Sequence, residues 1–311
     1  MLLNAIVAQI VVLLITALWL ALSNRRSSGD TTLKLVTIVC LFLGLYLGGV
    51  WVYPPSYGLA VTALLFTFLM AVHFRKTPTS TSTTRNIFNA LPVAILLPLS
   101  LFLLWQGAIG RLDAKGEIID LESPFKSENA ICVLSGGLSP LLNFHNFPSD
   151  KQGDIAQTYG LDFIKRTNSG FRTLAPNTWN PKPTKLDAYA MFEEPVFAPC
   201  EGLVVEQHAL RPDQAIGESD KINTSGNGVV LQCGDYHVHL HHFKQGTVLP
   251  ALGDRVSVGQ KIGLIGNSGN TIEPHLHLHV ETVVEQGKPR VHGKPVHMRF
   301  NGRFLARGDC I

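Results

Sequence analysis

Hydrophobic positions follow one another almost without interruption in the first third of the chain. Four runs there contain no Asp, Glu, Lys or Arg, and they cover Leu2–Ser23, Leu35–Tyr53, Tyr57–Phe74 and Phe88–Gly110. An α-helix needs about 20 predominantly apolar residues to cross the hydrocarbon core of a bilayer. The pattern therefore predicts four transmembrane α-helices in residues 1–110. Because these runs carry no charge that would mark a transport pathway, their expected role is to anchor the chain in a lipid bilayer.

Basic residues between the runs predict the orientation of these helices. Three Lys or Arg residues lie in the first connecting segment (24–34) and three in the third (75–87), whereas the second, around "PPS", has no charge. Lys and Arg collect on the cytoplasmic side of a membrane. We therefore expect the N-terminus to lie outside the cytoplasm, and the chain from about residue 111 onward to be extracytoplasmic as well.

Short strand-like runs broken by Gly and Asn dominate the rest of the chain. Examples are "GLVVEQ" at 202–207, "YHVHLH" at 236–241 and "HLHLHV" at 275–280. Runs of this length with frequent turn signals are typical of an antiparallel sheet or sandwich. The sequence predicts a mainly-β exported domain over residues 131–311, joined to the helices by a polar connector at 111–130.

Composition and cysteine usage narrow the chemistry. A net charge of +3 without a basic cluster is too weak to suggest a nucleic-acid partner, and none is expected. Four of the five cysteines lie in the predicted exported part: Cys132, Cys200, Cys233 and Cys310. An even number in an oxidising compartment is compatible with two disulfides in any of three pairings, and the alternative is four buried free thiols.

Histidines are concentrated in one part of the exported domain. Seven of the twelve lie within residues 237–279. Because alternate residues of a strand share a face, we expect His275, His277 and His279 to project together while the residues between them face the core. A catalytic zinc takes three protein ligands from His, Asp and Glu and leaves a fourth position for water. This strand can supply one or two of those ligands.

A second alternating group precedes this strand. His237, His239 and His241 are also spaced by two and should share a face. For these three we favour a solvated strand face over a chemical role.

The segment "GDRVSVGQKIGLIGNSGNTIEPHLHLHV" closely resembles the C-terminal half of the lysostaphin-like (LytM-type) zinc metallopeptidases, which cleave peptides of the bacterial cell wall. The hallmark of that family is a His-x-His strand after a Gly-rich turn, which "PHLHLH" provides. Upstream, "HHFKQGTVLPALGDRV" and "EEPVFAPCEGLVV" are similar to the preceding family segments. "LNFHNF" followed by "AQTYGLDF" resembles a variant of the family's His and Asp element, and the resemblance covers roughly residues 131–310.

Carried over position by position, the resemblance implies one Zn²⁺ ion held by His145, Asp162 and His277. It also implies that His275 is a catalytic base and that His242 is its partner, which would stabilise the oxyanion. His279 stands where relatives commonly have an acidic residue, and we expect it to contact a ligand rather than the ion.

Two of these assignments have alternatives. Sixteen residues separate the candidate His and Asp ligands, so Asp150 or Asp154 could replace Asp162, which is preferred because "YGLDF" reads as a buried strand. Strict alternation places His242 on the core face of its strand. A bulge at the strand end would re-aim it, and His241 is the alternative.

The sequence therefore predicts a zinc metalloendopeptidase that hydrolyses peptide bonds of peptidoglycan. It is expected as a multi-pass protein of the bacterial inner (cytoplasmic) membrane, with the enzymatic domain on the periplasmic or cell-wall side. The alternative is a non-catalytic LytM-like scaffold or regulator of cell-wall hydrolases. Because all five expected site positions are filled, the enzyme is favoured. The bond cleaved, and whether another membrane protein regulates the site, stay open.

Overall fold

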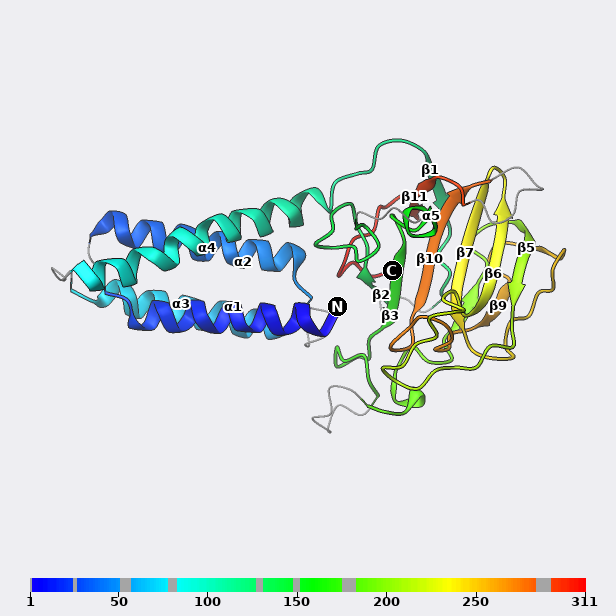
Figure 1. The fold of residues 1–311 in the computed structure, drawn as a ribbon, viewed down its shortest axis with the longest axis horizontal. Helices are drawn as coiled ribbons and strands as arrows, with labels where there is room; N and C mark the ends of the chain where they lie inside the picture. Colours follow the sequence, from blue (N-terminus) through cyan, green and yellow to red (C-terminus); the bar gives the residue numbers. More distant parts are fainter. Residues whose placement is uncertain are drawn as a thin grey trace. The chain divides into compact units, whose positions relative to one another are not determined.

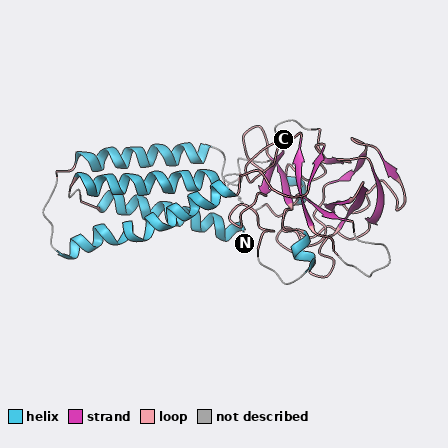
Figure 2. Cartoon of the chain, turned by 90° about the horizontal axis from the view of Figure 1, so that it is seen from above, coloured by secondary structure: helices cyan, strands magenta, loops and turns pink. Residues whose placement is uncertain are grey.

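The computed structural model describes residues 2–24, 27–50, 57–77, 83–126, 131–147, 152–174, 183–283 and 292–311. Contacts between residues divide the chain into two compact units, Met1–Gly110 and Arg111–Ile311. The first unit is helical and the second is built mainly from strands (Figures 1 and 2).

Each of the four hydrophobic runs forms a helix. These are α1 (Leu2–Leu22), α2 (Ser28–Gly48), α3 (Tyr57–Arg75) and α4 (Thr83–Ile109). Helices α2 and α4 approach closely, since a Cβ placed on Gly44 would lie 2.8 Å from the backbone nitrogen of Leu104. Small residues allow such backbone contact between apolar helices.

Two of these helices are long and apolar enough to cross a membrane by length and composition, namely Ser28–Gly48 and the Ala90–Ile109 part of α4. Within the described residues, the apolar segments of the other two helices are shorter, at Ala8–Leu22 and Ala60–Arg75. Of the four predicted spans, the described residues therefore support two.

The second unit contains a curled nine-stranded sheet. Seven strands follow one another in the order β1-β11-β10-β7-β6-β5-β8, and β3 joins β10 to β2. Their bounds are β1 Ile118–Leu121, β2 Ile131–Ser135, β3 Leu161–Lys165, β5 Gly202–His208, β6 Asn227–Cys233, β7 Tyr236–Phe243, β8 Arg255–Val256, β10 Leu276–Thr282 and β11 Pro295–Phe300. The remaining elements are a two-stranded sheet of β4 (Pro195–Phe197) and β9 (Lys261–Leu264), helix α5 (Gln152–Ala156) and the 3₁₀ turn η1 (Leu186–Ala188). The predicted mainly-β architecture is confirmed.

Strand β10 lies at the centre of this sheet and organises it. It pairs with β7 from His277 to Thr282, with β3 through its first half and with β11 through its second half. Leu276, Leu278 and Val280 point into the hydrophobic core together with Val238 and Leu240 of β7. The alternating histidines of both strands consequently occupy the opposite face of the sheet.

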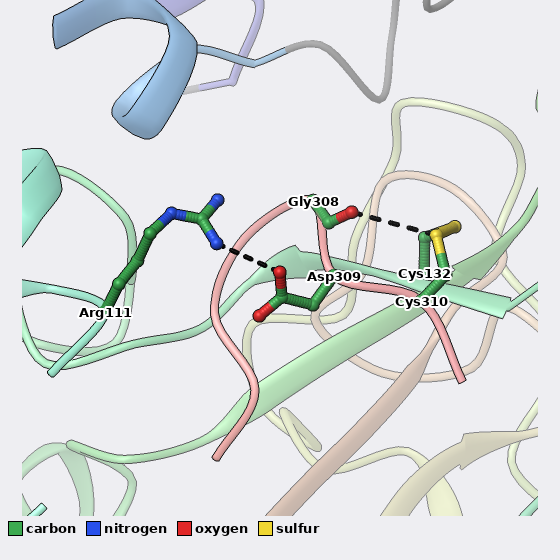
Figure 3. Close-up of a disulfide and its surroundings, with 5 residues drawn as sticks. All are labelled: Arg111, Cys132, Gly308, Asp309 and Cys310. Carbon is green, nitrogen blue, oxygen red and sulfur yellow. Dashed lines mark hydrogen bonds and ion pairs between the residues drawn. A yellow bond between two sulfur atoms is a disulfide. The ribbon is translucent and has the colours of Figure 1, made fainter. Parts of the chain in front are cut away.

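The segment expected as a connector contributes to the sheet. Within residues 111–130, β1 pairs in parallel with β11, with Ile118 opposite His297. Arg111 also reaches the C-terminal segment, where its guanidinium donates to the Asp309 carboxylate at 2.9 Å (Figure 3). Part of 111–130 is therefore packed into the β-rich unit.

Two disulfides join the four cysteines of the β-rich unit. One connects Cys132 on β2 to Cys310 near the C-terminus (Figure 3), and the other connects Cys200 to Cys233 at the end of β6. The first closes a loop with a sequence separation of 178 residues. It therefore holds the C-terminal segment against the strand that neighbours β3.

Candidate metal centre

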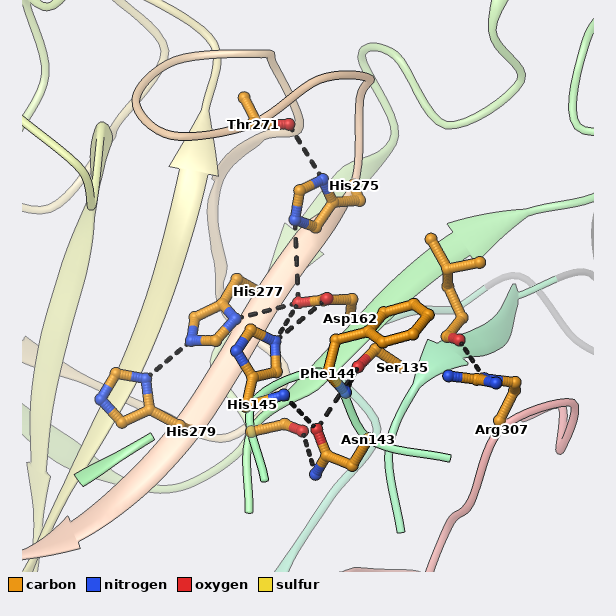
Figure 4. Close-up of polar contacts among 12 residues, drawn as sticks. Ser135, Asn143, Phe144, His145, Asp162, Thr271, His275, His277, His279 and Arg307 are labelled. Atoms are coloured by element: carbon orange, nitrogen blue, oxygen red, sulfur yellow. Dashed lines mark hydrogen bonds and ion pairs between the residues drawn. The ribbon is translucent and has the colours of Figure 1, made fainter. Parts of the chain in front are cut away.

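Three side chains from separate segments converge at one edge of the histidine-bearing face. Asp162 of β3 and His277 of β10 are directly opposite in the antiparallel register, and His277 Nδ1 lies 2.9 Å from Asp162 Oδ1. His145, from the loop after β2, places its Nε2 3.0 Å from Asp162 Oδ2 (Figure 4). One ligand atom from each of the three lies within 4.8 Å of the others.

The electrostatics of this group suit a cation. Burial would raise the pKa of Asp162, but the neighbouring His145 outweighs it and holds that pKa well below the usual value. Burial lowers the pKa of His277 to about 4, so its ring is neutral near pH 7. Burial would also lower the pKa of His145, yet the adjacent Asp162 carboxylate raises it. An ionised carboxylate with two imidazole nitrogens is a donor set that zinc prefers.

Asn143 fixes the loop that carries His145. Its side-chain oxygen accepts from the His145 backbone N–H at 2.9 Å, and its amide group donates to the carbonyls of Thr158 and Gly160 at 3.1 and 3.2 Å. Asn143 is fully buried. It thereby ties the loop to the segment that enters β3, so that His145 and Asp162 are held together.

The same loop is supported from its other side. The backbone N–H of Phe144 donates to Ser135 Oγ at 2.8 Å (Figure 4). The Arg307 guanidinium lies 4.4 Å from the centre of the Phe144 ring, and its Nε donates to the Leu134 carbonyl at 3.0 Å. The C-terminal segment therefore helps to position the histidine loop.

Gly160 leaves room for the two histidines. A Cβ at this position would lie 3.0 Å from His277 Cε1 and 3.3 Å from His145 Cδ2. These separations are tighter than ordinary van der Waals contact, so any larger residue would push on both rings. The absence of a side chain at position 160 is thus part of the geometry of the centre.

His275 lies beside this centre with a defined ring orientation. Its Nδ1 is 2.9 Å from the Glu273 carbonyl oxygen and 3.0 Å from Thr271 Oγ1. A carbonyl can only accept, so Nδ1 carries the hydrogen and the neutral ring keeps a lone pair on Nε2. That Nε2 is 3.7 Å from Asp162 Oδ1 and faces the centre (Figure 4).

A bulge turns His242 toward the same place. Strict alternation would direct it into the core, but Asn227 pairs with Phe243 and Gly228 pairs with His241, which leaves His242 as the extra residue. Its φ of 70° is in the left-handed region. Its ring centre lies 4.7 Å from that of His275.

The His242 ring is held in the same way as that of His275. Its Nδ1 donates to the Ser268 carbonyl at 2.8 Å, which again leaves the Nε2 lone pair available. Burial, and next the neighbouring His275, lower the pKa of His242 well below its usual value. Near pH 7 the ring is therefore neutral, and its Nε2 accepts hydrogen bonds and does not donate them.

The other sequence candidates occupy different places. His279 contacts His277 rather than Asp162, with 2.9 Å between His277 Nε2 and His279 Nδ1 (Figure 4). Asp154 is exposed on α5, and Asp150 lies outside the described residues. His241, the alternative to His242, lies beside His239, with 5.5 Å between their ring centres.

The expectation that β7 presents a solvated histidine face is wrong for two of its three members. His239 and His241 are buried, whereas His237 is half-buried. Sequence reasoning also missed Asn143, Gly160 and Thr271, whose partners are distant in sequence or belong to turns. The single sequence signal for Asn143 is its position two residues before His145.

Sequence comparisons relate part of this chain to known peptidases. Residues 184–296 match the sequence model of the family described as Peptidase family M23. Over 151 residues the chain is 33% identical to the peptidoglycan DD-endopeptidase ShyA of Vibrio cholerae serotype O1, a match that covers 45% of this chain and 30% of ShyA. Residues 184–296 of the β-rich unit are therefore similar to the domain of Peptidase family M23. The chain matches only about three tenths of the length of this curated relative.

Solved structures show weaker likeness. The catalytic domain of lysostaphin from Staphylococcus simulans is 21% identical, with a TM-score of 0.27, and the match covers 45% of this chain and 77% of that one. A zinc-containing peptidase from Vibrio cholerae is 22% identical, with a TM-score of 0.26, over 44% of this chain and 28% of that one.

Proposed function

We propose that this protein is a membrane-anchored zinc metalloendopeptidase that hydrolyses peptide bonds of bacterial peptidoglycan. The observation that carries the proposal is one constellation on the β10 face. Three side chains able to hold zinc, His145, Asp162 and His277, lie next to two histidines whose Nε2 lone pairs are available. Such a combination of ligands and bases is what metal-assisted hydrolysis requires.

The substrate class follows from the family match and the relative. An M23 domain and a likeness to a peptidoglycan DD-endopeptidase support cell-wall peptides as substrates. We infer a four-span anchor with the N-terminus outside, in the inner (cytoplasmic) membrane, which would place the domain on the side where peptidoglycan lies. Cysteine-accessibility labelling of the loops at 24–34 and 75–87 tests this topology, which requires both loops to be cytoplasmic.

Each residue of the constellation has a distinct task. A zinc ion held by His145, Asp162 and His277 would act as a Lewis acid on the scissile carbonyl and would lower the pKa of water toward about 7. His275 Nε2 accepts a proton from the attacking water as the water oxygen bonds to the carbonyl carbon. When the C–N bond breaks, that proton passes to the leaving amine. Thr271 and the Glu273 carbonyl keep His275 in the tautomer that this sequence of steps needs.

His242 is assigned a role that differs from the expected one. A neutral ring whose Nδ1–H is committed to the Ser268 carbonyl cannot donate to an oxyanion through Nε2. We propose that His242 is a second proton acceptor beside His275, and that it becomes a donor only after it has taken a proton.

The test combines metal content with hydrolysis by the full chain in detergent. Wild type is expected to contain zinc and to cleave cell-wall peptides, whereas His277→Ala should lose both. His208→Ala is the control, because His208 is exposed and bonded to Glu206. A His277→Ala protein that keeps its full zinc content would refute the ligand assignment. A zinc-loaded wild type that is inert on all cell-wall peptides would favour the scaffold alternative.

A further inference from the structure

A second histidine cluster lies on the same sheet face as the candidate metal centre but uses different residues. His239 and His241 come from β7, and His279 comes from β10 directly opposite His239. The ring centres of His239 and His279 are 4.2 Å apart, and the ring centre of His241 lies 5.5 Å from that of His239 and 5.9 Å from that of His279. One nitrogen from each of the three rings lies within 4.8 Å of the others.

These rings are withdrawn from solvent. His239, His241 and His279 are 9%, 8% and 4% exposed. Buried polar groups normally find hydrogen-bond partners. Among the hydrogen bonds of the described residues, none involves a ring nitrogen of His241, whose ring lies beside the other two. Both of its nitrogens are therefore available to a ligand.

A carboxylate orients one of the three rings. His239 Nε2 is 2.9 Å from Glu281 Oε1, and because an ionised carboxylate only accepts, Nε2 carries the hydrogen. The His239 Nδ1 lone pair is then available. The other Glu281 oxygen accepts from the Gly293 backbone N–H at 2.9 Å, which fixes the carboxylate. A carboxylate that holds the second nitrogen of a histidine is the usual support of a metal-binding imidazole.

We propose that His239, His241 and His279 form a second metal site, which binds a divalent transition-metal ion such as Zn²⁺. Two histidines spaced by two on one strand and a third across the ladder supply three imidazoles, the ligand number of an open zinc site. All three donors are nitrogens, which suits zinc, copper or nickel and disfavours Mg²⁺ and Ca²⁺. The proposal does not rest on the peptidase function, but the two sites are in contact. If His277 binds zinc through Nδ1, its Nε2–H donates to His279 Nδ1, so His279 has to turn this nitrogen away from His277 to bind a second ion.

The two metal sites are adjacent, so the variants have to separate them. His277 of the first site and His279 of the second share the 2.9 Å contact between their ring nitrogens. Changing either would disturb both sites. Asp162 and His241 are each confined to one site, and His237 is on the same strand face without belonging to either.

The experiment measures Co²⁺ and Zn²⁺ binding by the full chain in detergent, using equilibrium dialysis and visible absorption of the bound Co²⁺. Wild type is expected to bind two ions. His241→Gln and Asp162→Asn should each bind one, with different Co²⁺ spectra, and the double variant should bind none. His237→Gln, the matched control, should bind two. Glu281→Gln should weaken the second ion on the order of 10–100-fold without removing the first.

Each of the remaining outcomes would refute one of the two proposed metal sites. If His241→Gln binds as many ions as wild type, the second site is refuted. If wild type binds one ion and Asp162→Asn loses it, the second site is refuted while the first stands. If Asp162→Asn still binds two, the ligand set of the proposed peptidase fails instead. Circular dichroism checks folding, and His239→Gln provides a second test of the site if His241→Gln does not fold.

Discussion

The candidate metal centre and the second histidine cluster both take a histidine from β10, but they differ in chemistry. The first contains a carboxylate among its ligands, and two further histidines present Nε2 lone pairs beside it. In the second cluster the carboxylate of Glu281 is not a ligand but accepts a hydrogen bond from Nε2 of His239. Among the described residues, no anchored base accompanies the second cluster.

This difference indicates what makes the first group suited to hydrolysis. Burial and imidazole density are common to both groups. Only the first lies next to the bulge at His242 and the turn that carries Thr271 and Glu273, which together aim two rings at one point. The metal ligands alone would bind an ion. The bulge and the turn add His242 and His275, the two histidines that can accept a proton.

The largest effect is expected from Asp162→Asn. The change keeps the size of the side chain but removes the charge that favours a cation between His145 and His277. Loss of Lewis-acid assistance is worth several kcal/mol, so hydrolysis should fall on the order of 10⁴-fold, and zinc should be lost from this site. Peptide cleavage and zinc content measure both effects.

Asp154→Asn is the control for that variant, because Asp154 was the alternative ligand and is exposed on α5. It should retain zinc and activity. The opposite pattern, in which Asp154→Asn loses the ion and Asp162→Asn keeps it, would reverse the assignment.

His275→Ala separates the base from the ligands. Positioned acid–base groups contribute about 10²–10⁴-fold to rates, and the variant should lose activity within that range while it still binds zinc. His242→Ala should show a smaller loss, because its partner can still accept the proton. Rates measured with saturating peptide decide the order, and equal zinc content in both variants is required. A larger loss for His242→Ala would exchange the two roles.

Asn143→Ala tests the support of the histidine loop. It removes the acceptor for the His145 N–H and the amide donors to Thr158 and Gly160. Leaving buried backbone groups unsatisfied costs about 1–3 kcal/mol, so thermal stability should fall and zinc should bind more weakly. Asn146→Ala, which removes one bond to Leu138 from the same loop, should cost less. Equal costs for the two would show that Asn143 has no special role.

Local patterns in the sequence were sufficient to predict much of this arrangement. The alternation of His and Leu in β10 predicted the correct buried face, because successive side chains of any strand point to opposite faces of the sheet. The charge-free runs gave four helices, for the same local reason. The convergence of His145, Asp162 and His277 was obtained from family resemblance, because their spacing in sequence does not reveal it.

Features that depend on distant pairing were missed. The burial of His239 and His241 results from the register of β7 against β10 and β6, which no local pattern encodes. Strand β1 escaped notice because its partner, β11, lies at the other end of the domain. Asn143 was missed for the same reason, since its partners belong to the segment before β3.

The smallest effect is expected at Gly160, where the change adds one methyl group. The φ of Gly160 is outside the left-handed region, so alanine can adopt it, although the new Cβ would also lie 3.0 Å from the Gln157 carbonyl oxygen. The new Cβ would lie 3.0 Å from His277 Cε1 and 3.3 Å from His145 Cδ2, so both rings have to move by a few tenths of an ångström. Misplacement by about 1 Å costs on the order of 10²-fold, and this smaller shift should cost roughly 10-fold in hydrolysis. None of the three atoms nearest to that Cβ belongs to the second cluster, so the ion bound there should be unaffected. A Co²⁺ spectrum that changes for the first site alone would show that the two sites are structurally separate, whereas a change in both would mean that the contact between His277 and His279 transmits the displacement.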